Sequence, residues 1–125
     1  MTNLGGGEFG RLKAVVVKGP REAFRSGEAI AREWRDLAFT HAPDFERALA
    51  DHERFVSILT SGGADVLTLP AAPGAGLDSL YARDASVLAP QGVVLCRMGK
   101  AQRRAEPDAQ RFAFESWGLP VAGAI

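Results

Sequence analysis

The charged residues whose types and spacing could bind a small ligand lie between positions 78 and 104. Asp78 and Asp84 are six residues apart, and a basic stretch with Arg97, Lys100 and Arg103 follows them. In a regular strand an even separation places both carboxylates on one face. Such a pair could bind a guanidinium while an arginine binds the carboxylate of the same amino acid. The alternative is an ion-pair cluster on a solvated face of the protein.

Other chemistries have weaker support in the sequence. Cys96 ends the apolar run 93–96, where burial would disfavour a reactive thiolate, so we interpret it as a structural residue. His41 and His52 have no carboxylates at metal-ligand spacing, and His52 falls on the apolar stripe of a predicted helix, where a packed side chain is expected. Neither glycine-rich stretch has the context of a phosphate or dinucleotide loop. We therefore expect no metal, no cofactor and no catalytic residue that can be named.

The composition describes a globular chain without a dominant charge. It has 125 residues, with 15 Lys+Arg against 15 Asp+Glu, and 46% of its residues are hydrophobic. A net charge of zero disfavours binding to nucleic acid or to an anionic membrane, and no apolar run is long enough to cross a bilayer. The first residues do not resemble a secretory signal, and one cysteine cannot form an internal disulfide framework. These features favour a cytoplasmic protein.

Hydrophobic periodicity predicts the elements that would position the charged residues. A strand over 12–17 ends at Gly19-Pro20, an amphipathic helix follows near 30–37, and a longer helix begins at Pro43-Asp44 and ends at Gly62-Gly63. The later elements are strands over 64–69, 79–88 and 92–97, a helix over 106–117 and a strand from 119. We expect residues 1–10 to be a flexible terminus and residues 11–125 to form a single α/β domain with a mixed sheet, flanking helices and about two strand-strand-helix-strand units.

Three segments of the chain resemble a known group of enzymes in order and spacing. They are the helix start Pro43-Asp44-Phe45, the stretch from Asp78 through Arg83-Asp84, and Arg97-Met98-Gly99 with Arg103-Arg104-Ala105-Glu106. Over roughly residues 11–117 the chain resembles the first part of dimethylarginine dimethylaminohydrolases, and more broadly the guanidino-group-modifying (pentein) superfamily of arginine deiminases and amidinotransferases. Arg83 is a departure, because the dimethylarginine hydrolases have an acid there.

This resemblance implies a partial α/β propeller and a substrate that carries a guanidino group. Asp78 and Asp84 would hold the substrate guanidinium, and Arg103 would hold its carboxylate. The family's nucleophilic cysteine, with its helper histidine and glutamate, belongs to later blades, and neither Cys96 nor the two histidines can replace them. The resemblance thus implies a truncated or partial enzyme that is inactive alone and forms homo-oligomers or needs a C-terminal part. The alternative is a stand-alone, non-catalytic binding or assembly module.

Overall fold

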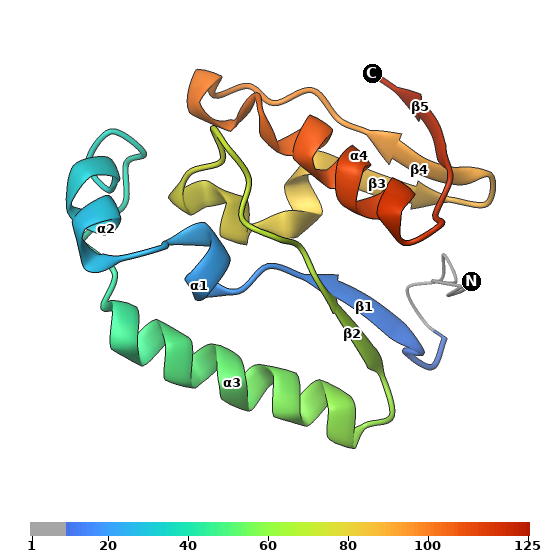
Figure 1. The fold of residues 1–125 in the computed structure, drawn as a ribbon, viewed down its shortest axis with the longest axis horizontal. Coiled ribbons are helices and arrows are strands. Elements are labelled where there is room, and N and C mark those ends of the chain that lie inside the picture. The colour runs from blue at the N-terminus through green and yellow to red at the C-terminus, as the bar shows by residue number, and fades with distance from the viewer. Residues whose placement is uncertain (1–9) are drawn as a thin grey trace.

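A computed structural model describes residues 10–125, so the predicted flexible terminus lies almost entirely outside the described residues. The chain forms two small sheets with helices around them (Figure 1). Strands β1 and β2 make a two-stranded parallel sheet, and β3, β4 and β5 make a three-stranded mixed sheet. The predicted α/β class with a mixed sheet is confirmed. In the described residues no helix combines the length and the apolar character needed to cross a membrane.

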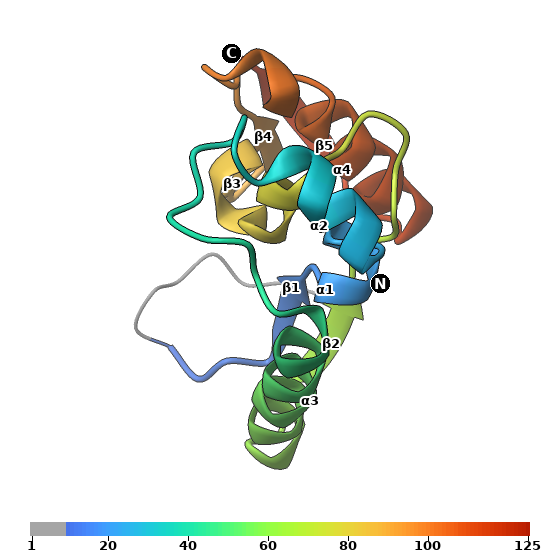
Figure 2. The same ribbon diagram turned by 90° about the vertical axis from the view of Figure 1, so that its left-hand side faces the viewer.

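The first sheet and its long helix follow the sequence pattern closely. Strand β1 (Ala14–Val17) pairs in parallel with β2 (Asp65–Thr68), and helix α3 (Phe45–Ser61) connects them along one side of the sheet (Figures 1 and 2). Asp44 caps α3, because its carboxylate accepts a hydrogen bond from the Arg47 backbone N–H at 3.1 Å. The apolar stripe of α3 is only half-buried.

The segment between β1 and α3 contains two short helices, α1 (Pro20–Ala23) and α2 (Gly27–Glu33). The sequence predicted one helix near 30–37, so the observed α2 begins and ends earlier. Ser26 explains its start, because the Ser26 hydroxyl accepts a hydrogen bond from the Ala29 N–H at 3.1 Å. After α2 the chain turns through Ala38, whose φ of 64° is left-handed.

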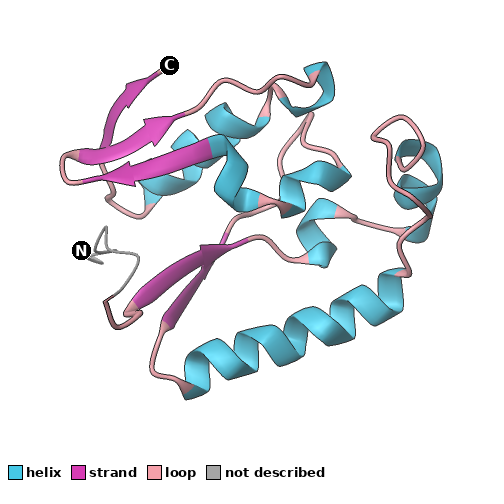
Figure 3. Ribbon diagram, turned by 180° about the vertical axis from the view of Figure 1, so that it is seen from behind, coloured by secondary structure: helices cyan, strands magenta, loops and turns pink. Residues whose placement is uncertain are grey.

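The prediction of a strand over 79–88 is wrong for most of its length. Residues Leu77–Leu80 and Ala82–Ala85 form two 3₁₀ turns, η1 and η2, and only β3 (Ser86–Ala89) is extended. Local hydrogen bonds stabilise the turns, since the Ser79 hydroxyl donates to the Gly76 carbonyl at 2.7 Å. Figure 3 shows these turns between the two groups of strands. The alternation argument that placed Asp78 and Asp84 on one face of a strand therefore does not apply.

The second sheet has the predicted strand-strand-helix-strand order. Strand β4 (Gly92–Leu95) pairs antiparallel with β3 and parallel with β5 (Val121–Ala124), and helix α4 (Glu106–Ser116) lies between β4 and β5 in the chain. The turn before β4 requires glycine at Gly92, where φ is 137° and a Cβ would lie 2.5 Å from the Pro120 carbonyl oxygen. The first sheet has only a strand-helix-strand order in the described residues.

Buried apolar side chains form two clusters. The first joins α1, α2 and η1 through residues that include Phe24, Ile30 and Leu77. The second joins β4 and α4 through Val93, Leu95, Phe114 and Leu119. Val16 of β1 packs against this second cluster and so connects the two sheets. Polar residues between the clusters make up the candidate site.

Candidate functional site

Arg103 is the centre of a buried polar network. It lies in η3 (Ala101–Arg103), and its Nε and Nη2 donate to the two carboxylate oxygens of Glu106, each at 2.8 Å. Its Nη1 donates to the Asp84 carboxylate at 2.8 Å. Its Nη2 also donates to the backbone carbonyls of Asp78 at 3.0 Å and of Tyr81 at 3.4 Å. Arg103 thus joins α4 to both 3₁₀ turns, and most of its hydrogen-bonding capacity is used internally.

The electrostatics of Arg103 agree with this role. The hydrogen bond to Glu106 raises the pKa of Arg103 above its usual value, the bond to Asp84 adds to this, and burial acts in the opposite direction. Glu106 is only 3% exposed and has both oxygens bonded to the guanidinium. A bidentate pair of this kind is strong and has a fixed geometry. It holds the turn before α4 in place.

Asp78 is held by a different cation. Its side chain is buried, and its Oδ2 accepts a hydrogen bond from Lys100 Nζ at 2.9 Å. The same ammonium donates to the Leu37 carbonyl at 3.0 Å, so it also joins this region to the segment after α2. The Lys100 side chain is 50% exposed. Its ammonium can therefore leave Asp78 for water at a lower cost than a fully buried cation could.

The structure brings the three predicted site residues together around one guanidinium. Arg103 contacts the Asp84 carboxylate and the Asp78 backbone, whereas the Asp78 carboxylate pairs with Lys100. The Asp84 side chain is 52% exposed, so this side of the network is open to solvent. Asp84 and Lys100 are thus the half-exposed members of the network, whereas Asp78 and Arg103 are buried.

On its inner side the network borders a small cavity of about 10 Å³, room for about one water molecule. Lys18, Ser79, Glu106 and Gln110 contribute to its lining. Lys18 is only 6% exposed. Burial lowers the pKa of Lys18, against the raising effect of Glu106 and Glu22. The cavity is too small for an amino acid.

The other residues considered from the sequence lie apart from this network. Cys96 is half-buried, so it is less buried than its place in an apolar run predicted. His52 is half-buried with its ring centroid 6.4 Å from that of Phe55, and His41 is exposed. Over residues 10–125, no cluster of three or more His, Cys, Asp or Glu side chains could hold a metal ion.

Sequence reasoning missed the partners that complete the network. Gln110 holds the start of β3, because its side chain accepts from the Ser86 hydroxyl at 2.6 Å and donates to the Ala82 carbonyl at 2.8 Å. Glu106 was also missed as a member, and Lys18 was missed as a buried cation that lines the adjacent cavity. A signal existed for Lys18, since a single charged residue ends the apolar run Val15-Val16-Val17. The three-residue step from Arg103 to Glu106 is also a helical ion-pair spacing.

Comparison with known proteins gives a match in structure only. No family model and no curated protein matches the sequence. A dimethylarginine dimethylaminohydrolase in an adduct with 4-chloro-2-hydroxymethylpyridine is similar over 90% of this chain, with a TM-score of 0.66 and 19% identity. A Pseudomonas aeruginosa enzyme of that name, a cysteine-to-serine variant bound to citrulline, has a TM-score of 0.65, 19% identity and 89% coverage of this chain.

A third structure, a histidine-to-glycine variant of a dimethylarginine dimethylaminohydrolase in an adduct with S-methyl-L-thiocitrulline, has a TM-score of 0.63 and 17% identity over 90% of this chain. The chain spans only 40–41% of the length of these three proteins. It therefore has a dimethylarginine dimethylaminohydrolase-like fold that corresponds to part of the larger one. The expected resemblance in fold is confirmed.

Proposed function

We propose that this chain is part of a guanidino-group-modifying α/β propeller and binds the guanidinium of an arginine-like amino acid at Asp78 and Asp84. The observation that carries the proposal is the arrangement of these two acids around Arg103 in a dimethylarginine dimethylaminohydrolase-like fold. Citrulline, which is bound in one of the similar structures, is an amino acid close to arginine in size and shape. In this proposal Arg103 contacts the ligand carboxylate through the part of its Nη1 group that Asp84 does not use.

The carboxylates are already paired with cations of the chain, so the ligand must displace them. At Asp78 a guanidinium would replace the ammonium of Lys100, which is half exposed and can move into water. At Asp84 the ligand would share the exposed oxygen atoms with Arg103. Contacts that stay wet are worth much less than shielded ones. We therefore expect dissociation constants of about 1 mM or weaker for arginine.

Titration of the ¹⁵N-labelled protein with L-arginine and with dimethylarginine tests this site by NMR. Saturable shifts should gather at residues 78–84 and 103. Asp84→Asn should weaken binding, whereas Asp65→Asn, which removes an exposed acid on β2, should not. Glu106 is unsuitable as a control because its loss would disturb Arg103 itself. The proposal fails if the shifts lie elsewhere or if both variants weaken binding equally.

We further propose that the chain alone does not catalyse the reaction of that superfamily. Covalent catalysis needs a nucleophile with a base within hydrogen-bond reach. Cys96 has neither a histidine nor an acid bonded to its side chain in the described residues. Purified protein should release no citrulline from arginine or dimethylarginine. Release that disappears in Cys96→Ser would show that Cys96 is the nucleophile after all.

A second candidate function, a cytoplasmic non-catalytic assembly module, is favoured by the open first sheet. In the described part of the chain β1 pairs only with β2, so each strand has one unpaired edge. Such edges tend to pair with another chain. We expect homo-oligomers or association with a further part of the propeller. Sedimentation equilibrium that gives only a 13.3 kDa monomer at tens of micromolar would contradict the homo-oligomer.

A further inference from the structure

A hollow of about 380 Å³ at the open end of the second sheet is lined by three arginines from separate segments. Arg97 follows β4, Arg104 follows η3, and Arg111 lies in α4. Residues 104 and 105 already have helical backbone angles, so Arg104 and Arg111 are two turns apart on one side of a continuous helical segment. Asp108 lies between them and also lines the hollow.

The three guanidinium groups form no ion pair in the described part of the chain. Arg25, Arg47, Arg54 and Arg103 each form an ion pair with a carboxylate, but the side chains of Arg97, Arg104 and Arg111 form no ion pair or hydrogen bond with a described residue. Glu106, the nearest acid in sequence to Arg104, is turned inward to Arg103. The side chains that line the hollow therefore carry three positive charges and one negative charge, in a chain whose net charge is zero.

We propose that this hollow binds a phosphate monoester with a compact organic group. Guanidinium groups bind phosphate oxygens through paired hydrogen bonds. Three of them around one hollow suit the two negative charges of a phosphate better than the single charge of a carboxylate ligand. A volume of about 380 Å³ is in the range of small-molecule sites. Leu95, Met98 and Pro107 line the same hollow and give the organic group an apolar wall.

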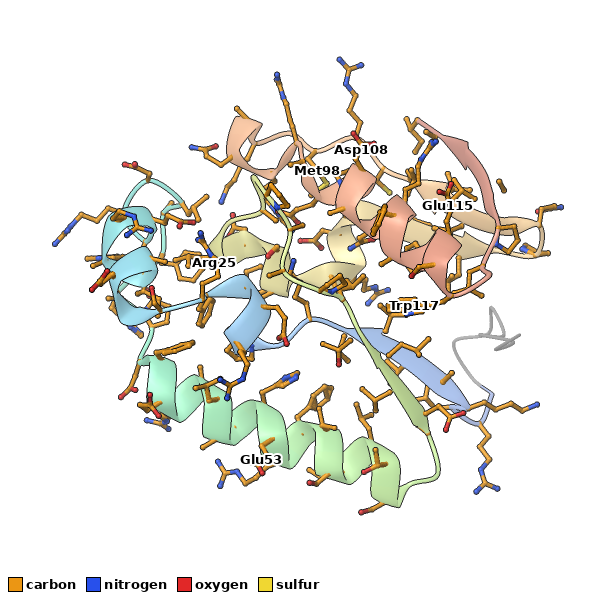
Figure 4. All side chains as sticks on the ribbon, viewed as in Figure 1. Arg25, Glu53, Met98, Asp108, Glu115 and Trp117 are labelled. Atoms are coloured by element: carbon orange, nitrogen blue, oxygen red, sulfur yellow. The ribbon has the colours of Figure 1, made fainter. Side chains whose placement is uncertain are left out.

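The phosphate site is separate from the proposed guanidinium site and does not depend on it. Asp78, Asp84 and Arg103 do not line the hollow. The two sites also have opposite charge, because one offers carboxylates and the other guanidinium groups. Figure 4 shows two residues that line the hollow, Met98 and Asp108, at α4. Failure of either proposal would leave the other intact.

Calorimetric titration of the full chain with phenyl phosphate, ribose 5-phosphate and inorganic phosphate in low salt tests the proposal. The double variant Arg104→Gln/Arg111→Gln should weaken binding of both esters by about tenfold or more. The matched control is Arg21→Gln/Arg32→Gln, which removes two exposed arginines from α1 and α2 and should leave binding unchanged. Asp108→Asn removes the one repelling carboxylate and should tighten binding about twofold to fivefold.

Three results would overturn the proposal. One is equal weakening by the two double variants, because it would mean a nonspecific charge effect. Another is inorganic phosphate that binds as tightly as both esters, because the organic group would then contribute nothing. The third is the absence of saturable binding by either ester. All four arginines are exposed and none contributes to the core, so we expect each variant to fold. Circular dichroism of each variant checks this.

Discussion

Replacement of Arg103 by alanine should be among the most destabilising single changes in this chain. The guanidinium donates five hydrogen bonds, and its removal leaves the Glu106 carboxylate, which is 3% exposed, without a partner. Loss of one member of a buried ion pair costs about 3–5 kcal/mol. Asp84 adds little, since its carboxylate is half exposed and can be solvated. Against a typical total of about 5–15 kcal/mol, this loss is large.

Urea unfolding followed by circular dichroism measures the effect. With a slope of about 2 kcal/mol per molar, a loss of 4 kcal/mol moves the midpoint by about 2 M. Arg104→Ala is the matched control, because Arg104 is the adjacent arginine but is exposed, and its effect should stay within about 0.5 kcal/mol. The double change Arg103→Met/Glu106→Leu should recover most of the loss, since it removes the uncompensated charge. Equal midpoints for Arg103→Ala and Arg104→Ala would refute the reasoning.

Four further predictions concern single positions. Lys18→Met should raise the free energy of unfolding at pH 7, because burial lowers the pKa of Lys18 in the folded state. This gain in stability over the parent protein should shrink as the pH rises toward 10.5, where the unfolded chain also loses the Lys18 proton. Urea unfolding measures both effects, and Lys13→Met, at an exposed lysine, should show neither. Gly92→Ala should destabilise the chain by at least about 1 kcal/mol in thermal unfolding, because the new Cβ would lie 2.5 Å from the Pro120 carbonyl oxygen. Gly99→Ala is the control and should be neutral, because the space around Gly99 is open. Asp44→Ala should cost about 1 kcal/mol through loss of the α3 cap, as measured by the urea midpoint against Asp51→Ala within the helix. Lys100→Met should lower stability but tighten arginine binding in the NMR titration, because it leaves the Asp78 carboxylate buried and free for a ligand cation.

Local signals in the sequence predicted the long elements well. Helix α3 has an aspartate cap, a periodic apolar stripe and two terminal glycines, and these three features together determine where it starts and ends. The β3–β4 hairpin and α4 also follow from residues close in sequence. In such segments the information needed to choose the conformation lies within a few residues of each position.

The stretch 77–85 could not be predicted in the same way. We expected a strand from residue 79, but Arg103 binds the backbone carbonyls of Asp78 and Tyr81 from more than twenty residues away and stabilises the 3₁₀ turns. The side chain of Gln110 binds the Ala82 carbonyl in the same manner. A tertiary interaction thus overrides local propensity. The same interaction brings Asp84 to Arg103, so the predicted residues meet for a reason other than strand alternation.

In the proposed guanidinium site, these contacts would let a buried acid serve both stability and ligand binding. Asp78 is 4% exposed, and an isolated charge there would be costly, so it needs a cation at all times. Lys100 supplies that cation from a half-exposed position, whereas Glu106 is held by Arg103 from a buried one. Exchange of Lys100 for a ligand guanidinium conserves the charge beside Asp78 and returns an ammonium to water. Exchange at Glu106 would instead break a bidentate pair that holds α4 and both 3₁₀ turns. In the proposed site, a ligand cation would therefore enter at Asp78 and Asp84 while the Arg103–Glu106 pair stays intact.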